Sequence, residues 1–294
     1  MDYESLKIFL HLSETLHFGK TSRECFLTPS ALSRIIQRLE KETGRQLFVR
    51  NNRSVMMTPD GERFRAFASD AIDRWRMFRE KEEPGAGLHG EVTIYCSVTA
   101  SFGMLHGILS AFRGAHPDVF IKLKTGEEAR AIHMLQDRAA DISIAARPDE
   151  LPAEIDFVES AVTPLLLIAP VCICEITDNL KKRRSWMEQP LILPEHGVAR
   201  KRIDELFRRS GHTLNVYGDV SGNEAIIAMV SLGCGVGVVP KLVLDQSPLK
   251  KEVRVLDAKP KLKPYQVGFC ISTTRFRPPA VQAFWDECVR MKAR

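Results

Sequence analysis

The sequence contains no long hydrophobic segment. Its longest apolar run covers residues 164–174, well short of the roughly 20 residues with which a helix spans a bilayer. The N-terminus lacks the charged start, apolar core and cleavage site of a secretory signal. We therefore expect a cytoplasmic protein without membrane association, which argues against an exported solute-binding protein.

The cysteines do not form the pattern of a metal site. The seven cysteines are an odd number and are scattered through apolar segments, as expected for reduced thiols in a cytoplasmic protein. Cys172 and Cys174 form a C-x-C pair, but no second group of ligands lies nearby, and structural zinc needs four ligands. We expect neither a metal site nor a cofactor.

The net charge is small, and three common catalytic and nucleotide-binding motifs are absent. The net charge is only +5 over 294 residues, so a nucleic-acid-binding surface would have to be local. The chain has no G-x-S-x-G elbow, no P-loop and no G-x-G-x-x-G that opens a helix after a strand. His106, His196, Ser97 and Ser101 could still form a catalytic set, so an enzyme is one alternative to a regulatory protein.

Residues 28–44 carry the strongest local pattern. Thr28 and Pro29 are typical of a helix start, and Gly44 is typical of a helix end. One face of this helix is apolar, with Leu32, Ile35, Ile36 and Leu39 at helical spacing. The other face carries hydroxyl, amide and guanidinium groups, on Ser30, Ser33, Arg34, Gln37, Arg38 and Lys41. Arginine and glutamine pair with base edges in the major groove, whereas an ordinary solvated face is the alternative.

The neighbouring segments favour DNA binding. Residues 3–17 predict an amphipathic helix and residues 21–26 a short second one, which makes 28–44 the second member of a helix-turn-helix. Residues 47–49 and 54–57 then predict two short strands around a basic tip that contains Arg50 and Arg53. The two arginines favour phosphate contacts, although a plain polar turn is the alternative.

Together these residues resemble the DNA-binding domain of the LysR-type transcriptional regulators. The matching residues are Ala31-Leu32-Ser33-Arg34, Leu47-Phe48, Arg50 and Thr58-Pro59-Asp60-Gly61. The chain departs from the family at Pro29-Ser30, where many members have Gln-Pro, and at Thr21-Ser22, which replace a more alanine-rich run. The resemblance implies an all-α winged helix-turn-helix over 1–58, with double-stranded operator DNA and RNA polymerase as partners. The DNA contacts that we expect are Thr28, Ser30, Ser33, Arg34, Gln37, Arg38, Arg50 and Arg53.

A linker helix with an apolar stripe follows the wing. The helix is expected to extend from residue 58 to about residue 83, and residues 83–87 have the composition of a hinge. The stripe consists of Phe64, Phe67, Ala68, Ala71, Ile72, Trp75 and Phe78. The resemblance implies that region 59–87 pairs two chains in a homodimer or homotetramer. Packing of the helix on its own effector domain is the alternative.

From residue 88 the chain alternates between strands and helices, which is typical of an α/β domain with a largely parallel sheet. We expect strands over 91–96, 119–124, 142–145, 165–169, 191–193, 214–217, 236–239, 253–256 and 267–272. Helices are expected over 102–112, 129–138, 200–209, 224–232 and 279–291. The family resemblance implies a two-lobed effector domain like that of periplasmic binding proteins over 88–294. Lobe one would comprise about 88–160 and 264–294, and lobe two about 161–263.

The same resemblance implies an inducer in the cleft between the lobes. Open α/β sheets bind ligands beyond the carboxyl ends of their strands, and the first strand ends before a helix start that favours an anion. An ordinary N-cap with nothing bound is the alternative. Lobe one would supply Ser97, Thr99, Ala100, Ser101, Thr125 and Gly126. Lobe two would supply Glu195, His196, Gly197, Arg200, Gly218 and Ser221.

Four segments narrow the resemblance: HFGKTSRECFLTPSALSRIIQRLE, IYCSVTAS, RKRIDELFRR and SLGCGVGVVP. They are similar to the branch of the family that controls isoleucine and valine biosynthesis. This similarity implies an activator of the acetohydroxyacid isomeroreductase gene, with 2-acetolactate or 2-aceto-2-hydroxybutyrate as the small carboxylate inducer. Another small carboxylate is the alternative.

Overall fold

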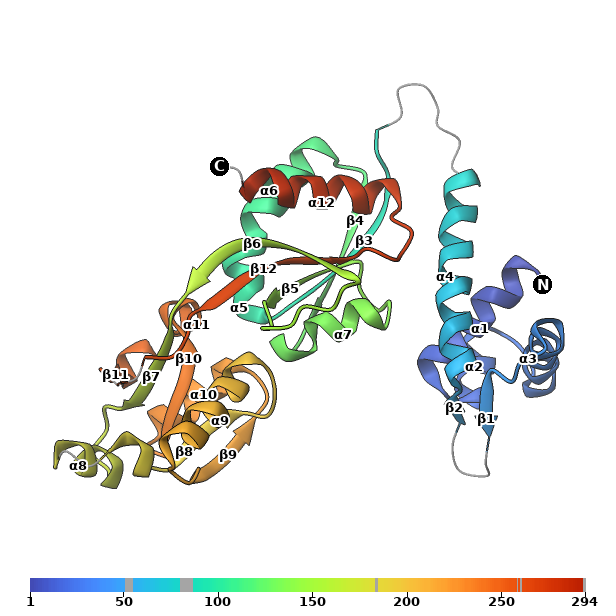
Figure 1. Ribbon diagram of the computed structural model, residues 1–294. Helices are drawn as coiled ribbons and strands as arrows, with labels where there is room; N and C mark the ends of the chain where they lie inside the picture. Colours follow the sequence, from blue (N-terminus) through green and yellow to red (C-terminus); the bar gives the residue numbers. More distant parts are fainter. Residues whose placement is uncertain (51–54, 80–86, 183–184, 258, 260, 293–294) are drawn as a thin grey trace. The chain divides into compact units, whose positions relative to one another are not determined.

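The computed structural model describes residues 1–50, 55–79, 87–182, 185–257, 259 and 261–292 (Figure 1). It divides into two compact units. The N-terminal unit comprises Met1–Ala86 with Arg275–Pro278, and the C-terminal unit comprises Gly87–Thr274 with Pro279–Arg294. The predicted hinge lies outside the described residues except for Gly87, and so does Arg53 at the predicted wing tip.

The N-terminal unit has the helices and the two-stranded wing of a winged helix-turn-helix. Its elements are α1 (Tyr3–Thr15), α2 (Phe18–Glu24), α3 (Pro29–Thr43), β1 (Phe48–Arg50), β2 (Val55–Met57) and α4 (Pro59–Arg79). The Thr28 hydroxyl accepts a hydrogen bond from the Ala31 amide, and Gly44 ends α3 in the left-handed conformation with φ of 66°. Both predicted signals for α3 are therefore confirmed. α2 begins earlier than predicted because His17 caps it.

The predicted apolar stripe of α4 is divided between two surfaces. Phe64, Ala68 and Ile72 are at most 9% exposed and pack into the core of the N-terminal unit. The Phe64 ring lies 4.8 Å from that of Phe9, centroid to centroid. Exposed aromatics on α4 are Phe67, Trp75 and Phe78. The stripe is therefore not one continuous surface for a second chain, because part of it completes the fold to which it belongs.

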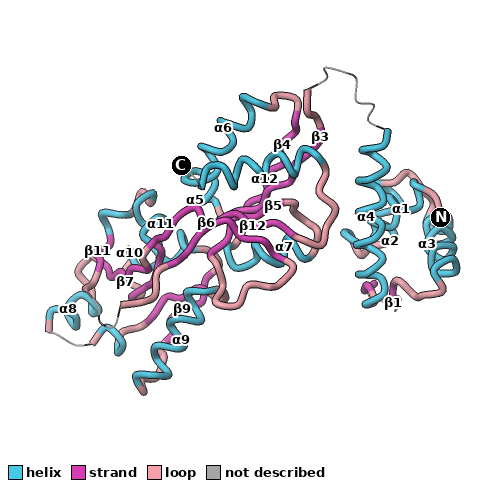
Figure 2. Tube along the Cα trace, turned by 45° about the horizontal axis from the view of Figure 1, so that its top comes forward, coloured by secondary structure: helices cyan, strands magenta, loops and turns pink. Residues whose placement is uncertain are grey.

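The C-terminal unit contains two five-stranded sheets, one in each lobe (Figures 1 and 2). The lobe-one sheet has the order β4-β3-β5-β12-β6, with β3 (Gly90–Cys96), β4 (Val119–Thr125), β5 (Ile142–Ala146), β6 (Ile155–Thr163) and β12 (Tyr265–Ser272). Its helices are α5 (Val98–Ala100), a π-helical turn (Ser101–Leu105), α6 (His106–Ala115), a 3-10 turn (Glu128–Arg130), α7 (Ala131–Gln136) and α12 (Pro279–Lys292).

The lobe-two sheet has the order β11-β7-β10-β8-β9. Its strands are β7 (Leu165–Pro170), β8 (Leu191–Pro194), β9 (Val216–Val220), β10 (Val236–Pro240) and β11 (Val253–Val255). The helices are α8 (Glu175–Lys181), α9 (Val198–Ser210), α10 (Asn223–Ser231) and α11 (Lys241–Gln246), with short 3-10 turns at Trp186–Glu188 and Lys250–Glu252. Buried aliphatic residues of both sheets belong to one apolar cluster.

The expectation of largely parallel sheets is wrong. In lobe one, β4, β3 and β5 are parallel, but β12 pairs antiparallel with both β5 and β6. In lobe two, β9, β8 and β10 are parallel, whereas β7 pairs antiparallel with β10 and β11. In lobe one the antiparallel pairing follows from the chain path. β6 leads out of lobe one and β12 leads back into it, so the two strands run in opposite directions. β6 and the short helices α8 and α11 were not predicted from the sequence. No helix within the described ranges is long and apolar enough to span a bilayer.

Candidate functional site

The exposed face of α3 is open at the positions where base contacts were predicted. Thr28, Ser30, Arg34 and Gln37 are exposed, and Ser33 is half-buried. Within the described part of the chain, neither Arg34 nor Gln37 makes a side-chain hydrogen bond or ion pair. A guanidinium and an amide are therefore presented to solvent close together on one helix face, which suits bidentate contacts with base edges.

Arg38 lies on the same helix but is already engaged. Its Nη2 lies 2.6 Å from Asp2 Oδ2 and 2.6 Å from Ser5 Oγ, at the start of α1. Hydrogen bonds from Ser5 and, more weakly, the charge of Arg38 hold the pKa of Asp2 below its usual value. The guanidinium thus ties α3 to α1, which distinguishes it from Arg34.

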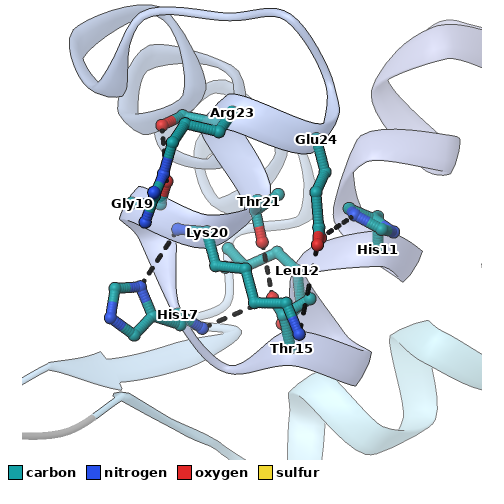
Figure 3. A network of polar contacts seen from close by, with 10 residues as sticks. His11, Leu12, Thr15, His17, Gly19, Lys20, Thr21, Arg23 and Glu24 are labelled. Atoms are coloured by element: carbon teal, nitrogen blue, oxygen red, sulfur yellow. Dashed lines mark hydrogen bonds and ion pairs between the residues drawn. The ribbon is translucent and has the colours of Figure 1, made fainter.

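A network of polar contacts fixes α2 against α1 (Figure 3). His17 Nδ1 accepts a hydrogen bond of 3.1 Å from the Lys20 amide and so caps α2. His11 Nε2 lies 2.8 Å from Glu24 Oε2 and joins the middle of α1 to the end of α2 (Figure 3). Because α2 and α3 are joined by a short turn, this network also fixes the direction in which α3 presents its polar face.

The wing is anchored by a residue that was not predicted to have this role. Glu40 Oε1 accepts hydrogen bonds from the amides of Leu47 and Phe48, at 2.9 Å and 3.2 Å. This carboxylate therefore holds the start of β1 against α3. β1 and β2 form an antiparallel pair in which Arg50 is opposite Val55, close to the wing tip.

In the C-terminal unit, a small cavity lies where strands of both lobes end. Glu127, Glu128 and Ala129 line it from lobe one, and residues 194–198 and 220–223 line it from lobe two. Tyr265, at the start of β12, completes the wall. The enclosed volume is about 30 Å³, room for about one water. An adjoining groove of about 690 Å³ shares Glu128, Ala129 and residues 196–198 with it.

Two helices begin at this cavity. Gly197 precedes α9 and Gly222 precedes α10, with φ of 95° and 90°, and neither helix has a side-chain cap. A Cβ on Gly197 would lie only 3.2 Å from the Ala129 Cβ, so the two lobes approach closely at this glycine. Amide N–H groups at two helix starts make the lobe-two wall favourable for an anion.

Two hydrogen bonds connect the lobes beside the cavity. Asn223 Nδ2 donates to Glu128 Oε2 over 3.4 Å, and the Thr99 hydroxyl donates to Glu224 Oε1. Both lobe-two residues belong to the first turn of α10. Burial raises the pKa of the Glu128 carboxyl to about 7, against the opposing effects of Asn223 and the Ala146 amide.

The predicted inducer residues are distributed unevenly around this geometry. His196, Gly197 and Ser221 line the cavity. Arg200 does not, because it pairs with Asp204 and Asp219 and also contacts the Pro194 carbonyl. Ser97 caps α5 by accepting from the Ala100 amide, and Ser101 donates to the Val98 carbonyl.

The four other predicted positions do not line this cavity, and Ala100 is buried in the apolar cluster. Thr125 ends β4, the Gly126 amide donates to the Cys96 carbonyl, and Gly218 lies in β9 beside Met229. Cavity residues that were not predicted from the sequence include Glu127, Glu128, Gly222, Asn223 and Tyr265. A usable signal existed for the lobe-two wall, because a glycine separates strand from helix in both PEHGV (194–198) and VSGNE (220–224).

The C-x-C pair does not extend into a ligand cluster. Cys172 is exposed and Cys174 is half-buried, and the Cys174 sulfur lies 3.3 Å from the Thr177 hydroxyl. Within the described ranges, no group of three or more His, Cys, Asp or Glu side chains is arranged to hold a metal ion.

Comparison with known proteins agrees with this architecture. Residues 3–62 match the family described as bacterial regulatory helix-turn-helix protein, lysR family, and residues 85–293 match the LysR substrate binding domain. The HTH-type transcriptional regulator IlvY of Escherichia coli strain K12 is 39% identical over 290 residues, which cover 97% of this chain and 98% of that protein.

Solved structures share the fold. A full-length OxyR variant from Pseudomonas aeruginosa aligns with a TM-score of 0.66 and 20% identity, covering 98% of this chain and 94% of that one. Full-length CbnR complexed with its target DNA aligns with a TM-score of 0.57 and 19% identity, covering 99% of this chain and 100% of that one. The named relatives are regulators, not enzymes. The predicted fold class is confirmed, and the chain belongs to the LysR family of bacterial helix-turn-helix transcriptional regulators.

Proposed function

We propose that this regulator activates the acetohydroxyacid isomeroreductase gene of isoleucine and valine biosynthesis in response to 2-acetolactate or 2-aceto-2-hydroxybutyrate. The observation that carries the proposal is the 39% identity to IlvY, in an alignment that covers 97% of this chain and 98% of that protein. It would act in the cytoplasm, on double-stranded operator DNA and together with RNA polymerase.

In this proposal the face of α3 reads the operator. Arg34 and Gln37 contact base edges because their side chains are exposed and unengaged within the described residues. Thr28, Ser30 and Ser33 contact bases or phosphates at the helix start, and Arg50 and Arg53 contact phosphates from the wing. Arg38 contributes by holding α3 on α1.

The exposed aromatics of α4 are proposed to hold the homodimer or homotetramer together. Trp75 lies 6.3 Å from Tyr3 and 6.0 Å from Phe78, measured between ring centroids, and Phe78 is 79% exposed. An exposed row of aromatic rings is more stable when a second chain covers it. Ile72 is excluded from this surface because it lies in the core of its own unit.

The inducer is proposed to bind in the cleft of the C-terminal unit. Its carboxylate would accept hydrogen bonds from the amides at the starts of α9 and α10, next to Gly197 and Gly222. His196 and Ser221 line the same wall and would hold its hydroxyl and keto oxygens. From the lobe-one side, Thr99 would contribute its hydroxyl.

The cavity is too small for a five-carbon acid, since about 30 Å³ accommodates a single water. We therefore propose that the inducer binds when the lobes separate along the adjoining groove, and that its contacts with both lobes favour one lobe arrangement over another. Such a ligand shifts the equilibrium only by the difference between its affinities for the two arrangements.

Calorimetry with freshly prepared 2-acetolactate and 2-aceto-2-hydroxybutyrate tests this proposal, with acetate as the control for a bare carboxylate. We expect saturable binding of one or both keto acids, recovery of the acids unchanged, and no measurable binding of acetate in the same range. Binding of neither keto acid would contradict the inducer assignment. Conversion of either acid would contradict its role as an inducer and indicate an enzyme.

A further inference from the structure

The cavity presents an electrostatic difficulty for an anionic inducer. Three of its lining residues are glutamates, Glu127, Glu128 and Glu195. An ionised keto acid at the starts of α9 and α10 would place a further carboxylate among them. Like charges that line one small cavity repel, so the complex needs a way to lower the negative charge.

Glu128 is the carboxyl that is best placed to change its charge. Asn223 Nδ2 and the Ala146 amide donate to it, and Glu224 of α10 adds an unfavourable like charge. The cation that acts on it is Arg202 of α9, whose Nη1 donates to the carbonyls of Lys263 and Pro264.

The remaining groups around Glu128 do not neutralise it. The Arg202 guanidinium lies 5.3 Å from the centre of the Tyr265 ring, and no ion pair joins Arg202 to Glu128 in the described part of the chain. The buried Tyr265 phenol also faces Glu128, with its pKa raised well above the usual value by burial. His196 lines the same cavity from the loop before α9.

We infer that the inducer binds together with one proton, which Glu128 takes up, and that the neutral Glu128 then donates its O–H to the inducer's carboxylate or keto oxygen. This inference rests on the proposed function, because it requires the inducer to bind in this cavity. The proton comes from solvent and no covalent bond of the inducer changes. Neutralising Glu128 replaces a repulsion by a hydrogen bond, and it costs little near neutral pH because burial already raises this pKa to about 7.

The consequence is a pH-dependent inducer affinity. Below about pH 7 the free protein already carries the proton, so affinity should be nearly constant. Above it, the proton must be supplied during binding, and affinity should fall by about tenfold for each pH unit. The number of protons taken up should rise over the same range from near zero towards one per site.

Calorimetry on the full-length protein tests this directly. Freshly prepared 2-acetolactate is titrated from about pH 6 to about pH 9, at each pH in two buffers with different ionisation enthalpies, so that the proton uptake is counted. Glu128→Gln keeps an oxygen acceptor for Asn223 but cannot titrate. Its affinity should not change with pH, and its proton uptake should be near zero. Glu127→Gln is the matched control, in the same cavity, and should keep the wild-type pH dependence.

Three results would overturn the inference. Wild-type affinity that is constant from about pH 6 to about pH 9, without proton uptake, would show that Glu128 does not change its charge. A pH dependence that persists in Glu128→Gln would place the proton on another group, such as His196. Absence of 2-acetolactate binding at every pH would instead remove the proposed inducer and this inference with it. Because the proton count is measured on wild-type protein, the first of these results does not depend on the folding of a variant.

Discussion

The face of α3 and the cavity of the C-terminal unit differ in how far each is prepared for its ligand. Arg34 and Gln37 are exposed and make no polar side-chain contact within the described residues. At the cavity and beside it, by contrast, Glu128 and Glu224 are already held by Asn223 and Thr99 across the lobes. In the proposed function, Arg34 and Gln37 break no internal side-chain contact to reach DNA, whereas a ligand that entered between the lobes would replace such contacts.

This difference suits the two roles. A surface proposed to recognise DNA benefits from a fixed geometry, and the α1–α2 network and the Arg38–Asp2 contact hold α2 and α3 against α1. A site that must switch needs two arrangements of similar free energy. Hydrogen bonds between the lobes, which the proposed inducer would replace, are one way to obtain two such arrangements.

The largest effect is expected from disrupting the hydrophobic core on which α3 packs. Ile72→Glu puts an unpaired carboxylate at a position that is 3% exposed and should destabilise the N-terminal unit by about 3–5 kcal/mol. Phe78→Glu, at a position that is 79% exposed, should leave folding intact and weaken self-association. Thermal melts and sedimentation separate the two effects. An intact fold but dissociated oligomer in Ile72→Glu would contradict the division of the α4 stripe.

The next-largest effect distinguishes the proposed base-reading residues of α3 from Arg38, which holds α3 on α1. Arg34→Ala or Gln37→Ala should each cost about 1–3 kcal/mol of binding free energy at the operator and little on random DNA. Arg38→Ala should weaken both duplexes similarly, because it loosens α3 instead of removing a base contact. Binding titrations on the two duplexes measure this difference. Equal losses on both for Arg34→Ala would refute base reading by this residue.

A smaller effect tests which lobe-one hydroxyl faces the cleft. Thr99→Val keeps the side-chain size but removes the hydroxyl that is proposed to contact the inducer, and should weaken 2-acetolactate binding by about tenfold. Ser101→Val removes only the bond to the Val98 carbonyl and should leave inducer affinity close to wild type. Calorimetry provides the readout, with operator binding as the check on folding. A greater loss in Ser101→Val would move the site towards Ser101.

The smallest effect concerns the wing. Arg50→Ala should weaken binding to all DNA sequences by a similar factor and reduce the salt dependence by about one unit of slope. Binding measured at several salt concentrations, on operator and random duplex, gives this slope. If the loss were confined to the operator, the wing would read sequence and not only phosphates.

The sequence predicts secondary structure correctly where the signals are local. Thr28, Pro29 and Gly44 predict the limits of α3, since cap and stop residues act within one turn. β6 was missed because it alternates between buried and exposed positions only weakly, and its partner β12 lies far along the chain. The stripe of α4 was interpreted as one surface because the core formed by Phe9, Leu32 and Phe48 is assembled by tertiary packing.

The cavity shows the same limit more clearly. Arg200 is the right residue type near the right strand, yet Asp204, one turn later on the same helix, already holds it. That competing pair could have been noticed in the sequence. The contact between Glu128 and Asn223 could not, because it joins two lobes across 95 positions of chain and depends on how two helix starts meet.

Footprinting on the DNA upstream of this gene, with and without 2-acetolactate, tests the proposed inducer-dependent regulation most directly. We predict protection of a defined operator by the protein alone and a change in the protected pattern when 2-acetolactate is added, but none with acetate. The proposed regulation would be contradicted if the protein protected no defined segment, or if 2-acetolactate left the pattern unchanged at concentrations that saturate the C-terminal unit.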